Sequence, residues 1–83
     1  MKIAVKTGGL LGKYLPEGSA RNLAELEMPA GASARDVIER LGMPSDGGYL
    51  VIHNGVAVPK AARAACRLSA GDELAIMPPL KGG

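Results

Sequence analysis

The stretch that decides the fold is SAGDELAIM, residues 69–77. Leu74 and Ile76 share one face of a predicted strand, whereas Ala75 and Met77 place apolar side chains on the other. Apolar character on both faces is typical of a strand buried between two neighbours, and an edge strand rarely has it. We therefore predict a turn at the start of this stretch and a central strand over its last five residues.

Two further strands are indicated nearer the start of the sequence. MKIAVKT, residues 1–7, alternates between apolar and lysine side chains, which is typical of a strand with one solvated face. NLAELEMP, residues 22–29, repeats this alternation with glutamates on the outer face. The intervening segment is rich in glycine, and we expect a long loop there, with a short helical turn at Leu10–Tyr14.

The strongest helix signal is GASARDVIERLGMP, residues 31–44. Ser33 is a good N-cap residue, and Asp36 stands three positions later, as in a capping box. Gly42 suits the C-terminal cap, and the following proline prevents continuation of the helix. The expected apolar stripe of this helix consists of Val37, Ile38 and Leu41.

A β-hairpin is predicted in YLVIHNGVAVP, residues 49–59. Asn54-Gly55 lies between two apolar runs, and a type I′ turn requires positive φ at both of its central residues. The next segment, KAARAACRL at 60–68, is rich in alanine and is compatible either with a helix or with one or two isolated turns.

The predicted order is strand, strand, helix, strand, strand, strand. One helix must cover one face of the sheet to bury its apolar stripe. If the first and last strands are both central, they can lie side by side and parallel. We therefore predict an α+β fold of the β-grasp (ubiquitin-like) type, with a mixed sheet of four to five strands and one main helix packed on one face. The domain covers residues 1–77, and residues 78–83 form a flexible C-terminal tail.

Composition excludes several classes of function. A chain of 83 residues with a net charge of +2 has room for one domain. It has neither a basic stripe nor a set of aromatic residues for stacking, so nucleic-acid binding has little support. No apolar run approaches the roughly 20 residues of a membrane helix. The single cysteine fits a cytoplasmic protein, and one cysteine with one histidine does not make a metal site.

Three candidate sites within the domain have little support. TGGLLGKY, residues 7–14, departs from a phosphate-binding P-loop at Thr7 and at Tyr14, so a flexible loop is favoured. His53 is expected on the surface or beside the hairpin turn, with no visible nucleophile or orienting partner. Cys66 is interpreted as a small buried hydrophobe, with a reactive thiol as the alternative. The protein is not expected to be an enzyme.

The ending MPPLKGG, residues 77–83, has a chemistry of its own. Prolines lack N–H donors, so strand pairing must stop at Pro78 and Pro79. The remaining tail can reach about 20 Å if extended. Its carboxylate is a poor electrophile unless ATP activates it as an acyl-adenylate. A narrow channel that excludes water would accept Gly82 and Gly83 because neither has a Cβ.

These features together resemble the MoaD/ThiS-type sulfur carriers, the ubiquitin-like proteins of molybdenum-cofactor and thiamine biosynthesis. The resemblance runs over nearly the whole chain, through KYLPEG, MPAGASARDVIERLGMP, VIHNGVAV and LSAGDELAIMPPLKGG. It implies that an E1-like adenylating enzyme uses ATP to activate Gly83, with no cofactor bound to the carrier itself. A cysteine desulfurase or rhodanese then supplies sulfur to form a thiocarboxylate. The partner-binding residues are expected to be Met77, Pro78, Pro79, Leu80, Lys81 and Gly82.

The resemblance leaves the acceptor of the sulfur open. The Pro-Pro pair and the length of the first loop favour the molybdopterin branch, in which the tail enters the large subunit of molybdopterin synthase. Thiazole synthase is the corresponding partner in the thiamine branch. His53, Lys81 and TGGLLGK depart from common family patterns, so a carrier for another metabolite is possible. The further alternatives are a protein modifier joined through Gly83 and a β-grasp binding module whose tail is inert.

Overall fold

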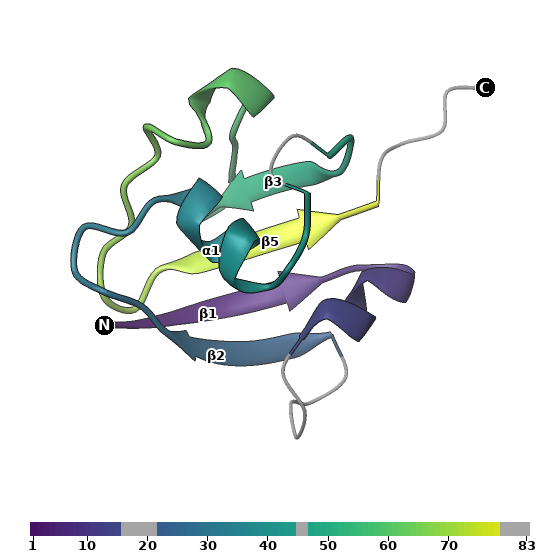
Figure 1. Ribbon diagram of the computed structural model, residues 1–83, viewed down its shortest axis with the longest axis horizontal. Helices are drawn as coiled ribbons and strands as arrows, with labels where there is room; N and C mark the ends of the chain where they lie inside the picture. The colour runs from purple at the N-terminus through teal and green to yellow at the C-terminus, as the bar shows by residue number, and fades with distance from the viewer. Residues whose placement is uncertain (16–21, 45–46, 79–83) are drawn as a thin grey trace.

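The computed structural model describes residues 1–15, 22–44 and 47–78 and contains one sheet with one α-helix (Figure 1). The helix and the strands occur in the predicted order. Two short 3-10 helices, η1 and η2, lie in the connections. The elements are β1 (Lys2–Thr7), η1 (Gly9–Tyr14), β2 (Leu23–Glu27), α1 (Ala34–Arg40), β3 (Leu50–His53), β4 (Val56–Ala57), η2 (Lys60–Ala62) and β5 (Glu73–Met77).

The sheet has the strand order β2-β1-β5-β3-β4. β1 and β5 are parallel neighbours, with Val5 opposite Leu74, and the other strand pairs are antiparallel. The apolar stretch at 73–77 therefore lies between β1 and β3, which confirms the central strand. This mixed sheet, with its first and last strands side by side, is the β-grasp arrangement (Figure 1).

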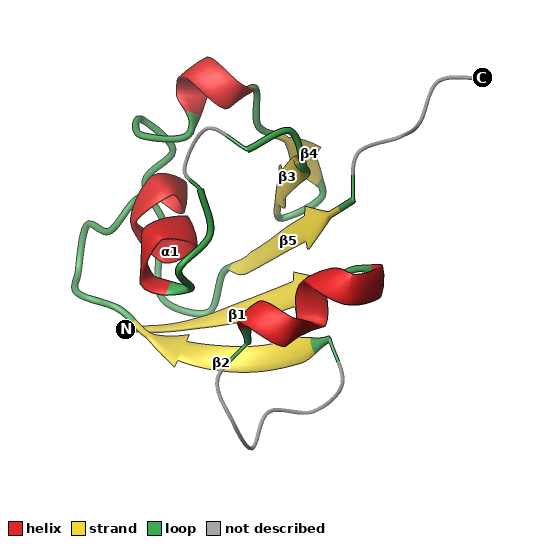
Figure 2. Cartoon of the chain, turned by 45° about the vertical axis from the view of Figure 1, so that its right-hand side comes forward, coloured by secondary structure: helices red, strands yellow, loops and turns green. Residues whose placement is uncertain are grey.

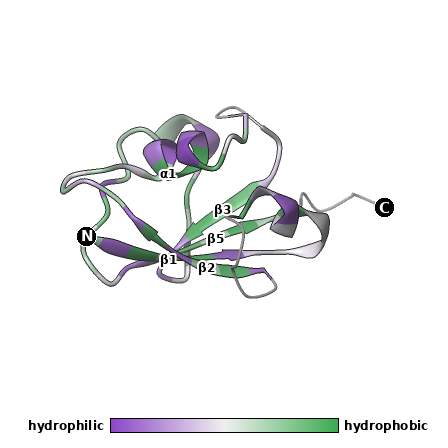
Figure 3. Cartoon of the chain, turned by 60° about the horizontal axis from the view of Figure 1, so that its bottom comes forward, coloured by the Kyte–Doolittle hydropathy of each residue, from purple (hydrophilic) through white to green (hydrophobic). Residues whose placement is uncertain are grey.

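The hydrophobic core lies between α1 and one face of the sheet, while the opposite face is open (Figure 3). Burying one Val, Leu or Ile side chain stabilises the folded state by about 1.5–3 kcal/mol. The same alternation that buries one side of β1 leaves its lysines outside. The largest fully buried side chains are Ile3, Val5, Val37, Ile38, Leu74 and Ile76.

α1 begins with the predicted capping box. The Ser33 hydroxyl accepts a hydrogen bond from the Asp36 backbone N–H at 3.2 Å, and the Ser33 N–H donates to the Asp36 carboxylate at 2.8 Å. The hydrogen bond from the Ser33 backbone lowers the pKa of Asp36. Gly42 has a φ of 79°, which favours glycine at the C-terminal end of the helix. Both predicted caps are confirmed.

The hairpin between β3 and β4 turns at Asn54 and Gly55, whose φ angles are 48° and 84°. Positive φ at both positions confirms the predicted type I′ turn. The alanine-rich segment at 60–68, whose structure the sequence left open, contains the 3-10 helix η2, then turns, and an isolated β-bridge between Arg67 and Ser33.

A buried arginine explains why the alanine-rich segment stays close to the domain. The Arg63 guanidinium donates to the backbone carbonyls of Gly47 and Tyr49 at 3.0 and 2.8 Å. It also lies 4.6 Å from the centroid of the Tyr49 ring. Only 3% of Arg63 is exposed. A charged side chain buried this deeply must be hydrogen-bonded, so its partners hold the loop before β3 against η2.

Candidate functional site

The candidate site begins where β5 leaves the sheet, at Met77 and the exposed Pro78, which together form the tail root. Gly8 donates its N–H to the carbonyl of Ile76 at 3.1 Å. A Cβ on Gly8 would lie only 2.8 Å from the Met77 sulfur and 2.9 Å from Pro78 Cδ. Such distances are shorter than normal contacts, so the tail root occupies space that only glycine leaves free.

Gly9 also lies against the tail root, and we call Gly8 and Gly9 together the seat of the tail root. Its φ is 53°, and a Cβ there would lie 3.5 Å from Pro78 Cγ. η1 follows directly, close to the end of β1 (Figure 2). The predicted helical turn is confirmed and starts one residue earlier than expected. The interpretation of residues 7–14 as simply a flexible loop missed this contact, because the two glycines oppose the tail root only once β1 and β5 pair.

Most of the predicted tail lies outside the described residues. Pro79, Leu80, Lys81, Gly82 and Gly83 therefore stay predictions, both as partner-binding residues and as the site of activation. Of the six predicted partner-binding residues, the structure places Met77, half-buried, and Pro78.

An apolar patch on the open face of the sheet lies beside the tail root. In β5, Leu74 and Ile76 point into the core, so Ala75 and Met77 point outward. Their cross-strand neighbours in β3 and β4 share that outer face. We call this set the apolar patch: Leu50, Ile52, Ala57, Ala75 and Met77.

The sequence predicts Met77 as a partner-binding residue but not its neighbours in β3. Leu50 is the first residue of β3, a strand of four residues, and it is 41% exposed. The sequence signal for the patch is the alternation Leu50, Val51, Ile52. Successive residues of a strand point to opposite faces, so if Val51 is buried, Leu50 and Ile52 must share the outer face. The pairing of β3 with β5 was needed to place these residues next to Met77.

The other half of the open face is charged. Lys2 and Lys6 of β1 point outward, and Glu25 of β2 lies opposite Ala4. Lys6 forms a salt bridge with Glu73 of β5, with an N–O distance of 2.8 Å. The open face therefore changes from charged over β2 and β1 to apolar over β3 and the end of β5.

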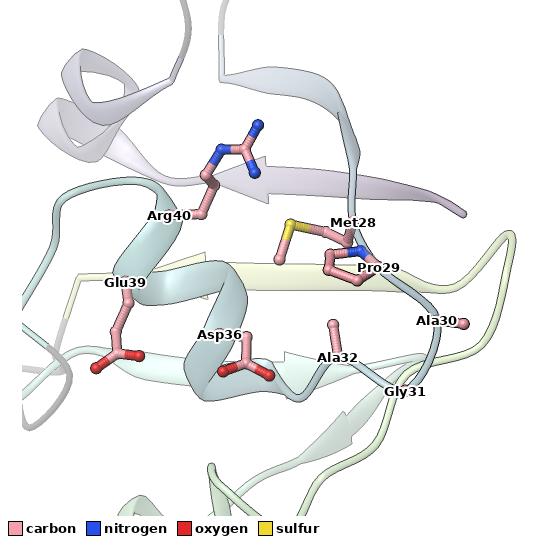
Figure 4. Close-up of a pocket in the computed structure, with 8 residues that line it drawn as sticks. All are labelled: Met28, Pro29, Ala30, Gly31, Ala32, Asp36, Glu39 and Arg40. Carbon is pink, nitrogen blue, oxygen red and sulfur yellow. The ribbon is translucent and has the colours of Figure 1, made fainter.

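A separate hollow lies between the end of β2 and the outer side of α1 (Figure 4). Asp36 and Glu39 point from the helix toward it, but both carboxylates already have partners. Asp36 caps the helix, and Glu39 lies 3.5 Å from the Arg35 guanidinium. These residues support the helix, and the described residues that line the hollow bring together no set of groups for catalysis.

The structure corrects the interpretation of His53. Cys66 is half-buried and packs against the hydrophobic core, in line with its interpretation as a small hydrophobe. His53 lies beside the hairpin turn as expected, but it is not isolated. Its Nε2 lies 2.7 Å from the Asp72 carboxylate, and its Nδ1 lies 3.5 Å from the Cys66 sulfur. The expectation that His53 has neither a nucleophile nor an orienting partner beside it is therefore wrong. The three residues lie in separate segments, which meet only when β3 pairs with β5.

The described residues provide no group of three or more His, Cys, Asp or Glu side chains arranged to hold a metal ion. None of the helices within 1–15, 22–44 and 47–78 has the length and apolar character needed to cross a membrane.

The sheet order, its parallel central pair and the single helix over one face define a ubiquitin-like β-grasp protein. The model of the ThiS family matches residues 17–83, and the chain belongs to this family. No curated protein matches it.

Three solved structures show similar folds at low sequence identity. A putative molybdopterin converting factor, subunit 1, from Pyrococcus furiosus has a TM-score of 0.71 and 22% identity, covering 95% of this chain and 98% of that one. The H. volcanii small archaeal modifier protein 1 has a TM-score of 0.71 and 20% identity over 95% and 98%. Urm1 from Trypanosoma brucei has a TM-score of 0.67 and 16% identity over 99% and 95%.

Proposed function

We propose that the protein is a sulfur carrier whose C-terminal glycine, Gly83, becomes a thiocarboxylate and donates sulfur in molybdopterin biosynthesis. Family membership supports this proposal, since the matched region extends through Gly83. The observation that carries it is the juxtaposition of the tail root with the apolar patch. A partner that docks on the patch would find the root of the reactive tail at the edge of the same surface.

The chemistry assigned to Gly83 requires prior activation. A terminal carboxylate has a pKa of about 3.5 and is ionised at neutral pH, which makes it a poor electrophile. An E1-like enzyme would join it to the AMP part of ATP and release pyrophosphate. A persulfide sulfur from a cysteine desulfurase or rhodanese would then displace AMP. Reductive cleavage of the resulting acyl disulfide by a thiol leaves the thiocarboxylate.

The geometry of the tail root supports delivery of Gly83 to such an enzyme. β5 is held on both sides by β1 and β3, so its end is a fixed starting point for the tail. Gly8 adds close contact at Met77 and Pro78. A fixed root limits the volume that the tip must search, which raises its effective concentration at a partner's active site.

The apolar patch is the proposed docking surface for the activating enzyme and for the acceptor enzyme. Exposed Leu50 provides an apolar anchor of the kind that dominates binding energy in small interfaces. The charged half of the face would form the rim, where ion pairs contribute more to orientation than to affinity. The large subunit of molybdopterin synthase is the proposed acceptor, with thiazole synthase as the alternative.

The proposal is tested by the mass of the full chain after incubation with its activating enzyme, ATP and a sulfur source. We expect one oxygen to be replaced by one sulfur, located by peptide mapping at Gly83. A chain that lacks Gly83 is the control and should stay unchanged. If the full chain gains neither adenylate nor sulfur from an enzyme shown to be competent, the sulfur-carrier proposal is wrong.

A protein modifier is the second candidate, suggested by the fold shared with a small archaeal modifier protein. Activation at Gly83 would be the same, but a lysine amine would take the place of the sulfur nucleophile. Conjugates of higher mass, with an isopeptide bond to Gly83, would support the modifier. Thiocarboxylate without conjugates would support the carrier.

A further inference from the structure

A cluster of three reactive side chains lies at the amino end of β5, away from the tail root. His53 ends β3, Asp72 precedes β5, and Cys66 belongs to the segment between η2 and β5. The five residue steps from Asp72 to Met77 along the strand separate the cluster from the tail root by about 16 Å. The cluster and the tail are thus distinct sites.

The position of the proton on His53 follows from the charge of Asp72. Hydrogen bonds from the His53 ring, the Ser69 backbone N–H and the Asn54 side chain lower the pKa of Asp72 to about 2. An ionised carboxylate only accepts hydrogen bonds, so His53 Nε2 must carry the hydrogen that it shares with Asp72 at 2.7 Å. In the neutral ring, Nδ1 is then an acceptor.

This tautomer directs a free lone pair at the thiol. The Cys66 sulfur lies 3.5 Å from His53 Nδ1, within reach of a hydrogen bond from sulfur to nitrogen. The order thiol, imidazole, carboxylate is that of an activated nucleophile, its base and the group that orients the base. Asp72 is a positioning residue here, since it acts on the thiol through His53.

Other charged side chains near the cluster are bonded elsewhere. Arg67, next to Cys66 in the chain, donates to the carbonyl of Gly31 at 3.0 Å. Glu73, next to Asp72, pairs with Lys6. In the part of the chain that the structure describes, the titratable groups that face His53 are therefore Cys66 and Asp72.

The thiol is protonated at rest yet reachable from solvent. Burial raises the pKa of the Cys66 thiol, and the negative charge of Asp72 adds to the effect. Cys66 is nonetheless only partly buried, and 23% of the His53 side chain is exposed. A neutral thiol is a weak nucleophile, so reaction requires loss of its proton, and His53 is in place to take it.

We propose that Cys66 is a nucleophilic thiol, with His53 as its base, and that its substrates are small disulfides or persulfides. The sulfur of Cys66 attacks a sulfur of the substrate, a new S–S bond forms and the substrate's S–S bond breaks. The thiol proton passes to His53 Nδ1 and then to the leaving thiolate. A disulfide yields a mixed disulfide on Cys66, a persulfide yields a Cys66 persulfide, and neither reaction needs an external oxidant.

Sulfur substrates suit this cluster better than acyl substrates. Acyl transfer needs N–H donors aimed at an oxyanion, and two of the N–H groups near Cys66, those of Ala34 and Leu68, already donate to the carbonyls of Cys66 and Ala32. Thiol–disulfide exchange places its developing charge on the leaving sulfur and needs no oxyanion hole. The inference goes beyond the proposed function, because it requires no reaction at Gly83.

The test uses the full chain with two probes, oxidised glutathione and glutathione persulfide. Intact mass gives the rate of adduct formation, and peptide mapping places the adduct on Cys66, separately from Gly83. Failure here and failure of the tail chemistry are therefore distinguishable. Cys66→Ala is the control and should form no adduct with either probe.

The pH profile distinguishes an activated thiol from an ordinary one. Between about pH 8 and pH 6, an isolated thiol loses about tenfold in rate per pH unit, following its thiolate fraction. The wild-type chain should lose markedly less with at least one probe, because transfer to His53 needs no free hydroxide. His53→Gln should restore the full slope and lower the rate at neutral pH by at least about tenfold. Asp72→Asn should give an intermediate profile.

The probe that shows this behaviour identifies the substrate class. Melting temperatures of the variants check that they fold. If they do not fold, the pH profile of the wild-type chain, compared with that of free N-acetylcysteine, shows whether the Cys66 thiol is activated. A wild-type slope and rate equal to those of N-acetylcysteine with both probes, or the absence of any Cys66 adduct, would overturn the proposal.

Discussion

The two ends of β5 are held in different ways. At the carboxyl end, close packing of Gly8 against Met77 and Pro78 fixes the backbone, and apolar side chains remain exposed beside it. At the amino end, Asp72 accepts hydrogen bonds from His53 and from the Ser69 N–H at 2.7 and 2.8 Å. One end borders the proposed docking surface, and the other is a polar network. Changes at the two ends should therefore have different consequences.

The largest expected effect is on docking at the carboxyl end. Leu50→Asp places a charge in the apolar patch and should lower the efficiency of activation by the E1-like enzyme by about 30-fold or more, as loss of an interface anchor does. Enzyme kinetics with varied carrier concentration measure this as a rise in KM.

Leu23→Asp is the matched control for Leu50→Asp. Leu23 is 42% exposed, close to the 41% of Leu50, and lies on the same face of the sheet but over its charged half. This variant should retain activation within a few-fold. Equal losses for the two variants would show that the apolar patch has no special part in docking.

The next largest effect concerns the seat of the tail root. Gly8→Ala introduces a Cβ that would overlap the Met77 sulfur and the Pro78 ring, so one or both of these groups must shift. We expect a loss of about 1–3 kcal/mol in the free energy of unfolding, as for other overpacked sites, together with slower activation. Denaturant unfolding measures the first and the enzyme assay the second.

Gly48→Ala is the control for Gly8→Ala, since a Cβ on Gly48 would have nothing within 4 Å. It should leave both the stability and the activation almost unchanged. A Gly8→Ala protein as stable and as readily activated as the Gly48→Ala protein would contradict the packing assigned to the tail root.

The smallest effect concerns the pH dependence of the amino end. The pKa of Asp72 falls from 3.8 to about 2 on folding, chiefly because of its hydrogen bond with His53. A carboxyl whose pKa is lower in the folded state stabilises the protein above its unfolded pKa, and this contribution is lost as the pH falls through the folded value. The wild type should therefore lose stability between about pH 4 and pH 2 more steeply than Asp72→Asn. Urea unfolding at several pH values measures this, and parallel curves would contradict the assigned network.

The ends of β5 also differ in how far the sequence predicts them. Local patterns suffice for the Ser33–Asp36 capping box, for the Asn54-Gly55 turn and for β5 as a central strand. Each depends on residues within a few positions of one another, and the structure confirms all three.

The remaining features depend on residues that are distant in the chain. His53 and Asp72 are 19 positions apart, and they meet only through the register of β3 with β5. The seat at Gly8 likewise requires the parallel pairing of β1 and β5, and a glycine gives no sign in sequence of what will approach it. The burial of Arg63 could not be predicted from its alanine-rich surroundings. Nothing local indicates that its guanidinium turns inward to carbonyls of the loop before β3.

We propose that Gly83 serves chemistry and does not stabilise the fold. The most direct measurement is ATP–pyrophosphate exchange by the activating enzyme, with the full chain and with a chain that lacks Gly83. Exchange should depend on the full chain and disappear without Gly83, while the two chains melt at the same temperature. Undiminished exchange without Gly83, or a clear fall in its melting temperature, would contradict the claim.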